Sequence, residues 1–458
     1  MVRAIVISAG FVLGSWSVCA YPRKGEVDTR QVRGKCDIPV VLDAGKNVWL
    51  NFTLHPNRYY RNQVLAAAEA IDVTDSKLKK RSLVVANSGS FLWIESKEDV
   101  SKIEDAAKDV PCDQILGIVV SGLTADGCDT ATGHSPTRRD AGNYVADFTA
   151  PIARQIKANP NTAFALIIEP GILPFVVRNP YLKTCETAQK TYFDNIPSAL
   201  KLFDLPNSIT YLDAAHGGFF GWTRGTYKDS NERLNSPRDI TSHLHQIWLA
   251  AGGPSLKQFR GIATNVKSYN SWDLSPGEAF QDETTVCADL FNRARNEQQY
   301  LRILKDEFKR INSSMPVHAI MDVTRNTNSG IRQYWHDWCN VNHASFGRVP
   351  SLELTKYIHE KNSNFDTLVW ATPAGFSDGT SDERSASYKL NCTGPAALQP
   401  MPEKNAWSQA YFEMMLRETR WDPYLVGSRN VDESRQFSWK RSDDTDVQHE
   451  GLVRRCDG

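Results

Sequence analysis

The chain has no excess charge of either sign, because its 53 lysines and arginines are balanced by 53 aspartates and glutamates. It also lacks a basic cluster dense enough to follow a row of phosphates. A chain without a net positive charge or a basic cluster does not attract nucleic acid or an anionic membrane surface. We therefore expect a neutral ligand, without a nucleic-acid or membrane partner. Our expectation for the oligomeric state is a monomer.

Linkers and small appended modules are missing as well. No Ser/Thr/Pro-rich stalk divides the 458 residues, and no small cysteine-dense module stands at either end. A separate carbohydrate-binding module is therefore not expected. The sequence predicts a single domain over residues 41–425, preceded by a signal peptide (1–20) and an N-terminal segment (21–40). A charged C-terminal tail over 426–458 follows the domain.

The first 20 residues have the parts of a secretory signal peptide. Arg3 precedes a mostly apolar run from Ala4 to Trp16, and the small residues Val18 and Ala20 define a cleavage site after Ala20. The run is too short to span a bilayer. We therefore expect a secreted, extracellular protein. Three Asn-x-Ser/Thr sequons also fit a glycosylated secreted chain, at Asn51, Asn312 and Asn391.

The cysteines do not have the spacing of a metal site. Eight cysteines remain after the signal peptide, and their wide, irregular spacing is unlike that of zinc ligands. An even number of cysteines in an oxidising compartment favours disulfides. We expect no metal and no cofactor. The eight are Cys36, Cys112, Cys128, Cys185, Cys287, Cys339, Cys392 and Cys456.

Seven short apolar runs alternate with segments of helical period. The runs lie near 90–96, 115–121, 163–169, 208–214, 260–266, 317–323 and 367–373, and helix candidates include 141–158, 185–203, 238–251 and 287–312. Continuous apolar runs are typical of parallel strands that are buried on both faces. So many strand and helix units in one chain favour a closed α/β barrel. A doubly wound open sheet is the alternative.

Polar and aromatic side chains follow these runs, where a barrel enzyme carries its chemistry. Each residue alone has a structural explanation, such as an ion pair for Asp213 or a core position for His216. Together they are typical of a site for a neutral, hydroxyl-rich ligand whose sugar rings stack on aromatic side chains. The polar set is Asp213, His216, Asn265, Asp322, Arg325, Asp378 and Asp382, and the aromatic set includes Trp93, Trp222, Trp272 and Trp338.

Five segments carry a resemblance to a known family: "YLDAAHGGFFGW", "RGIATNVKSYNSW", "WHDWCNV", "DGTSD" and "AALQPMPEKNAWSQAYF". They closely resemble glycoside hydrolase family 6, the secreted cellobiohydrolases II and endoglucanases that cleave cellulose, in collinear order over residues 40 to 420. The resemblance implies a distorted, seven-stranded, TIM-like α/β barrel. It also implies the disulfides Cys128–Cys185 and Cys339–Cys392, and gives no pairing for Cys36, Cys112, Cys287 and Cys456. The matching site residues are Asp213, His216, Trp222, Asn265, Arg325, Trp338 and Asp378.

The family's catalytic acid is missing from this sequence. Members of the family invert the anomeric carbon, which requires a protonated carboxyl group and a second carboxylate that helps water to attack. The resemblance implies that the acid belongs at Gly171, in "EPG", and that the aspartate holding it protonated belongs at Gly127, in "SGLTADGC". Four further positions differ from the family. The resemblance implies that Ser121 replaces a tyrosine that distorts the sugar ring, and that Phe219 replaces a tryptophan that stacks on sugar. Thr372 and Phe376 replace a lysine and a glutamate that bind sugar.

These losses all affect the part of the site that protonates the leaving group. Asp213 and Asp378 remain as candidates for the carboxylate that helps water to attack. We expect a β-1,4-glucan-binding protein whose hydrolysis is lost or severely impaired. One alternative is an active inverting glucanase that uses a non-standard acid such as Asp126, whereas Glu169 is predicted to be structural. The other is a host or cell-surface interaction protein that reuses the barrel.

Overall fold

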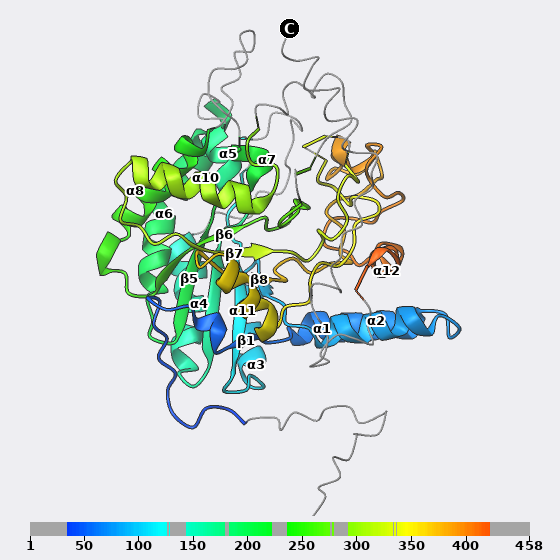
Figure 1. Cartoon of the computed structure of the whole chain (residues 1–458), viewed down its shortest axis with the longest axis horizontal. Coiled ribbons are helices and arrows are strands. Elements are labelled where there is room, and N and C mark those ends of the chain that lie inside the picture. Colours follow the sequence, from blue (N-terminus) through cyan, green and yellow to red (C-terminus); the bar gives the residue numbers. More distant parts are fainter. Residues whose placement is uncertain are drawn as a thin grey trace, which may run out of the picture.

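The computed structural model describes residues 34–125, 128, 143–178, 183–221, 236–274, 277–278, 292–332, 334–335 and 337–421. Its centre is a single parallel sheet, with helices packed around the outside (Figure 1). The strands are β1 (Thr53–Leu54), β2 (Leu92–Ile94), β3 (Gln114–Val120), β4 (Ala163–Ile168), β5 (Ser208–Asp213), β6 (Phe259–Thr264), β7 (His318–Asp322) and β8 (Phe365–Val369). Each of the seven runs predicted from the sequence overlaps one of these strands.

The strands occupy seven positions around the barrel, as predicted. From β3 to β8, each strand pairs with the next one along the chain. β3 pairs with β4 along one edge from Ile115 to Val120. Along its other edge it pairs with β1 at residues 114–115 and with β2 at residues 118–120. β1 and β2 are therefore two pieces of one strand position. β1 was not predicted, because two residues are too few to show a pattern.

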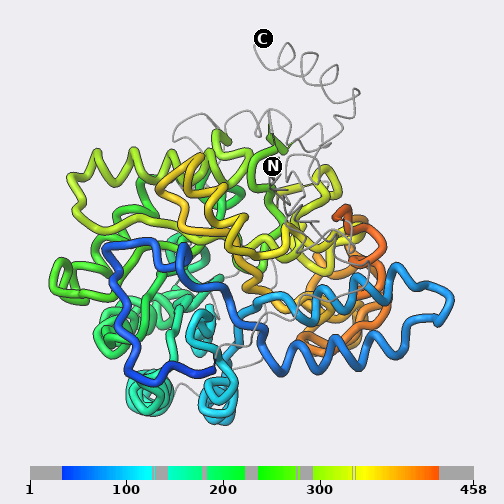
Figure 2. Tube along the Cα trace, turned by 60° about the horizontal axis from the view of Figure 1, so that its bottom comes forward, coloured from blue at the N-terminus to red at the C-terminus, as the bar shows by residue number. Residues whose placement is uncertain are grey.

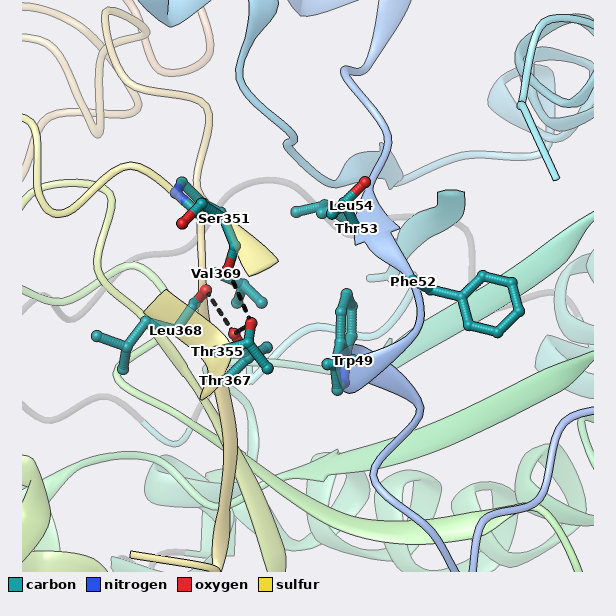
Figure 3. A pocket seen from close by; sticks show the side chains of 10 residues that line it. Trp49, Phe52, Thr53, Leu54, Ser351, Thr355, Thr367, Leu368 and Val369 are labelled. Carbon is teal, nitrogen blue, oxygen red and sulfur yellow. Dashed lines mark hydrogen bonds between the residues drawn. The ribbon is translucent and has the colours of Figure 1, made fainter. Parts of the chain in front are cut away.

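The barrel is distorted at the seam between this divided position and β8. One backbone hydrogen bond crosses it, from the amide of Phe91 to the carbonyl of Trp370 at 3.0 Å. A small pocket lies at the seam, with Trp49 and β1 on one side and residues 367–369 of β8 on the other (Figure 3). None of the predicted site residues lines this pocket. The seam explains why the sheet is a nearly closed barrel and not a regular ring.

The strand residues alternate between two cores, which is why their sequences are continuously apolar. In β3, Ile115 and Val119 face the barrel interior, where they join residues of the other strands. Leu116, Ile118 and Val120 face the surrounding helices. At the amino ends of the strands, the interior core gives way to a buried polar network. There the guanidinium of Arg260 donates to both oxygens of Asp366 at 2.6 and 2.8 Å.

Helices follow most of the strands. They are α1 (Arg58–Ala70), α2 (Ser76–Asn87), α3 (Ser101–Ala107), a π-helical turn (Tyr144–Thr149) continued by α4 (Ala150–Ala158), α5 (Leu173–Arg178), α6 (Glu186–Leu202), α7 (Gly217–Phe220), α8 (Pro237–Ala250), α10 (Glu297–Arg310), α11 (Leu352–Lys361) and α12 (Gln409–Glu418). The helix predicted over 287–312 begins only at Glu297. Its start is fixed by Asn296, whose side chain accepts from the amide of Gln299 and caps the helix.

The hairpin formed by α1 and α2 packs beside α12, at the opposite end of the chain (Figure 2). The guanidinium of Arg81 donates to the carbonyl of Leu416 at 2.7 Å and to that of Arg417 at 3.2 Å, which satisfies carbonyls at the end of α12. Within the described ranges, no helix is both long and apolar enough to cross a membrane.

Three disulfides are present in the described part of the chain. Cys128–Cys185 and Cys339–Cys392 confirm the pairings that the resemblance implied. The third, Cys36–Cys112, ties the segment before β1 to the turn before β3 and was not predicted. Cys287 and Cys456 lie outside the described residues.

Candidate active site

Most of the predicted site residues lie at the carboxyl ends of the strands, where the barrel fold places chemistry. Asp213 ends β5, Asp322 ends β7, and Gly171 follows β4. Three residues from the sequence analysis, Asp126, Gly127 and Trp222, lie outside the described residues.

Open space borders the position at which the resemblance implies the acid. Within the part of the chain that the structure describes, no heavy atom beyond the neighbouring residues lies within 4 Å of the point where a β-carbon on Gly171 would stand. The backbone of Gly171 has φ +83°, in the left-handed region. Its amide donates to Oδ2 of Asp213 at 3.1 Å. A side chain at residue 171 would therefore have room, and the nearest identified acidic group is the carboxyl group of Asp213.

Asp213 is almost completely buried, with 1% of its surface exposed. Burial raises the pKa of its carboxyl group to about 7, although the amides of Gly171 and Ala215 and the charge of Lys267 favour the ionised form. The sequence analysis grouped Asp213 with Asp378 as a base-side candidate. In the structure its carboxyl group accepts from the backbone amide of Gly171, where the resemblance implies the acid, and its role on the base side stays a prediction. At neutral pH this carboxyl group is present in both protonation states.

Asp378 is held by an ion pair. One guanidinium nitrogen of Arg325 donates to both of its oxygens, at 2.8 and 2.9 Å. The hydroxyl of Tyr269 and the amide of Asn340 donate to Oδ2, at 3.0 and 2.9 Å. Arg325 is 2% exposed, and its other terminal nitrogen donates to the carbonyl of Lys267. The guanidinium of Arg325 thus holds the carboxylate of Asp378 in place, and substrate binding by Arg325 stays a prediction.

The side chain of Asn265 hydrogen-bonds to the backbone of two neighbouring segments, and a ligand contact of this residue stays a prediction. Asn265 is fully buried, with φ +61°. Its Nδ2 donates to the carbonyls of Asn270 and Asp322, at 3.1 and 2.8 Å, and its Oδ1 accepts from the amide of Asn270 at 3.1 Å. The side chain thus fixes the loop between residues 265 and 270 against the end of β7.

His216 is a neutral imidazole with a defined tautomer. Its Nδ1 accepts from the amide of Gly218 at 3.1 Å and lies 3.0 Å from Nδ2 of Asn270. Because both neighbours are donors, the ring proton resides on Nε2. Burial and the nearby charge of Arg332 lower the pKa of the imidazole to about 3. Its ring centroid lies 4.8 Å from that of Phe219, so this predicted binding residue contacts an aromatic position of the family's site.

The tryptophans of the aromatic set have different environments. Trp338 is half-buried, and Nζ of Lys389 lies 5.5 Å from its ring centroid. Trp93 is also half-buried and donates to the carbonyl of Ala371 at 2.6 Å. Trp272, in contrast, is 5% exposed and meets Phe365 edge-on at 4.1 Å. It is therefore a core residue, and not a sugar platform as the sequence suggested.

Lys267 is a site residue that the sequence analysis missed. It follows β6 with φ +65°, and its amide donates to the hydroxyl of Thr372 at 2.9 Å. Its ammonium lies 4.2 Å from the ring centroid of Trp93, close enough for a cation–π interaction, and its charge acts on Asp213. Thr372 is the position of the lysine in the family. The signal was available in "ATNVKSYNSW", where a lysine follows a buried strand directly.

Glu169 has the structural role that was predicted. It is fully buried with φ +46°. Its carboxylate accepts from the amides of Gly122 and Leu123, at 2.7 and 3.0 Å, and from the hydroxyl of Tyr144 at 2.7 Å. These bonds fix the loop after β3, which precedes Gly127 in the sequence.

The described residues contain no cluster of side chains suited to a metal ion.

Comparison with known proteins identifies relatives along most of the chain. The model of a family described as "Glycosyl hydrolases family 6" matches residues 46–419. The chain is 38% identical over 399 residues to the 1,4-beta-D-glucan cellobiohydrolase CEL6C of Podospora anserina, covering 87% of this chain and 94% of that protein. It is 30% identical over 376 residues to Exoglucanase 3 of Agaricus bisporus, covering 81% of this chain and 77% of that protein.

Solved structures share the fold. Cellobiohydrolase II (Cel6A) of Humicola insolens, in complex with glucose and cellotetraose, has a TM-score of 0.68 and 28% identity, over 82% of this chain and 99% of that one. The catalytic core domain of the cellobiohydrolase Cel6A of Chaetomium thermophilum has a TM-score of 0.69 and 27% identity, over 81% and 98%. These matches confirm the distorted barrel that was predicted.

Proposed function

Because the chain belongs to glycoside hydrolase family 6, we propose that it binds a β-1,4-glucan chain at the carboxyl ends of its strands and hydrolyses it slowly at best. The observation that carries this proposal is the open space at Gly171, where the family's acid belongs. A general acid contributes about 10²–10⁴ in rate, so its loss depresses turnover without removing the surface that holds the ligand. The apolar start of the chain supports secretion as the setting for this activity.

Several retained groups support ligand binding. Trp338 and Trp93 are half-buried aromatic side chains, and His216 keeps a ring N–H whose tautomer is fixed by its neighbours. Tryptophan faces and neutral N–H donors suit uncharged sugars, because the faces stack on the rings and the donors bond to hydroxyl groups. Cello-oligosaccharides are therefore the proposed ligands.

A second candidate function, residual glucanase activity with a non-standard acid, is favoured by one observation. Asp213 lies beside the position of the missing acid and has a pKa of about 7. The acid considered first, Asp126, lies outside the described residues, so Asp213 replaces it as the candidate.

Calorimetric titration with cellohexaose tests the proposal, together with release of reducing ends from the same sugar. We expect binding at micromolar to millimolar concentrations and turnover about 10²-fold or more below that of a family member with an intact acid. Trp338→Ala should weaken binding. Tyr357→Ala, which removes an exposed aromatic ring on α11, should leave it unchanged. Absence of binding at millimolar cellohexaose, or turnover equal to that of the intact enzyme, contradicts the proposal.

A further inference from the structure

We propose that Asp213 is the proton donor for the hydrolysis that this chain retains, in place of the carboxyl group missing at Gly171. The inference rests on the proposed function, because it assumes that a glucan chain binds in the same site. Asp213 was predicted from the sequence to be a candidate for the carboxylate that helps water to attack, and not for the acid.

The geometry brings Asp213 to the acid position. β4 and β5 are neighbours, with Ile168 paired to Leu212, so the residues that follow these strands emerge side by side. The amide of Gly171 donates to Oδ2 of Asp213 at 3.1 Å. Among the described residues, no atom beyond the neighbouring residues, and none of Asp213, lies within 4 Å of the point where a β-carbon on residue 171 would stand. Asp213 thus reaches the position of the missing acid through the backbone amide of Gly171.

The environment of Asp213 keeps a proton available. Burial is the largest influence and raises the pKa of the carboxyl group to about 7. The ammonium of Lys267 opposes this, and the carboxyl group of Glu297 on α10 reinforces it. The phenol groups of Tyr192 on α6 and Tyr300 on α10 also face Asp213 and are themselves kept neutral by burial. At mildly acidic pH the group is therefore mostly protonated, as a general acid must be.

The proposed step balances as an inverting hydrolysis. The proton leaves the carboxyl group of Asp213 for the glycosidic oxygen, while the bond from the anomeric carbon to that oxygen breaks and its electron pair stays on the oxygen. A water oxygen bonds to the anomeric carbon from the opposite face, and Asp378 accepts the proton that this water loses. Asp378 then releases its proton to solvent, and solvent reprotonates Asp213. The guanidinium of Arg325 holds the carboxylate of Asp378 in place through an ion pair.

The test compares two substrates that differ in how much protonation their leaving group needs. Cellotetraose releases a sugar alkoxide, which requires an acid, whereas 2,4-dinitrophenyl β-cellobioside releases a stable phenolate. We expect Asp213→Asn to lower kcat/KM for cellotetraose by about 10²-fold or more and to change that for the aryl substrate only a few-fold. A purely structural role of Asp213 would lower both equally and would overturn the inference.

A pH profile and a matched variant complete the experiment. With cellotetraose, the rate of the natural chain should fall as pH rises through about 7, and this basic limb should disappear in Asp213→Asn. Glu297→Gln is the control, because Glu297 is buried with a pKa of about 7 but bonds to Gly217 and Asn270. It should retain the ratio between the two substrates and a basic limb, and that limb should move to lower pH because Glu297 no longer raises the pKa of Asp213.

The outcomes separate this inference from the proposed function. If Asp213→Asn fails to fold, the pH–rate profiles of the natural chain and of Glu297→Gln still test the inference. A fall in rate near pH 7 that is present in both supports Asp213 as the proton donor. Absence of this fall from the natural chain refutes the inference. Cellohexaose binding without any detectable cellotetraose hydrolysis also refutes it, while leaving the proposed function intact. Loss of cellohexaose binding by the natural chain contradicts both.

Discussion

Restoring a carboxyl group at residue 171 should restore hydrolysis. In Gly171→Asp the new β-carbon meets no atom of the described residues within 4 Å, so there is room for it at this position. The new carboxyl group would stand next to that of Asp213, and two carboxyl groups in contact cannot both ionise, so one of them keeps its proton. Asp213 would thereby do for the new residue what the family's second aspartate does. We expect reducing-end release from cellotetraose to rise by about 10²-fold or more.

The variant should fold with little loss of stability. A non-glycine residue in the left-handed region costs about 1–2 kcal/mol, and the stiffer unfolded chain returns about 0.4–1 kcal/mol, which leaves a net cost of about 0–1.5 kcal/mol. Gly330→Asp is the matched control, because Gly330 also has a left-handed φ, of +70°, and open space around its α-carbon. Urea unfolding should give similar costs for the two variants, and only Gly171→Asp should gain activity. Equal activity in the two would refute the claim that the missing acid limits turnover.

Three further predictions concern charge. Arg260→Met should lower the free energy of unfolding by about 3–5 kcal/mol, because it leaves the buried carboxylate of Asp366 without its ion-pair partner; a loss below about 1 kcal/mol in urea unfolding contradicts this. Folding raises the pKa of Asp213 and Glu297 from 3.8 and 4.5 to about 7, so the folded state binds more protons between these values. Stability should therefore be greatest below pH 4 as far as these two groups are concerned and fall as pH rises toward 7, with a shallower slope in Asp213→Asn. Lys267→Met removes a charge that favours ionised Asp213, so the basic limb of the cellotetraose profile should move to higher pH, and a move to lower pH would contradict the assignment.

Much of the fold was predictable because parallel strands buried on both faces leave a clear record in the sequence. All seven runs overlap a strand, since the interior-facing and helix-facing residues are both apolar. β1 was not predictable, because a strand of two residues is too short to show a hydrophobic pattern. The predicted start of α10 at residue 287 was wrong, although the capping residue Asn296 marks the true start.

The candidate site was predictable as a set of residues but not as a set of roles. Position after a strand indicated that Asn265 and Arg325 belong to the site. Their partners, a loop backbone and the carboxylate of Asp378, come from other strands and loops. The contact between Asp213 and Gly171 could not be predicted from the sequence either, since it depends on the register between two neighbouring strands. Sequence position locates a side chain on the barrel, whereas its hydrogen-bond partners decide what it does.

The divided strand position has a consequence for how the barrel assembles. Every pairing from β3 to β8 joins strands that follow each other along the chain, so this part of the sheet can grow by local additions. Closure is different, because it joins Trp93 to Ala371 and Tyr60 to Ala374 across 278 and 314 residues. Contacts between residues so far apart in the sequence have the largest entropic cost of loop closure, so we expect them to form late in folding. Trp93 also meets Lys267 across the barrel mouth. The cation–aromatic pair of Lys267 and Trp93 therefore depends on closure of the ring.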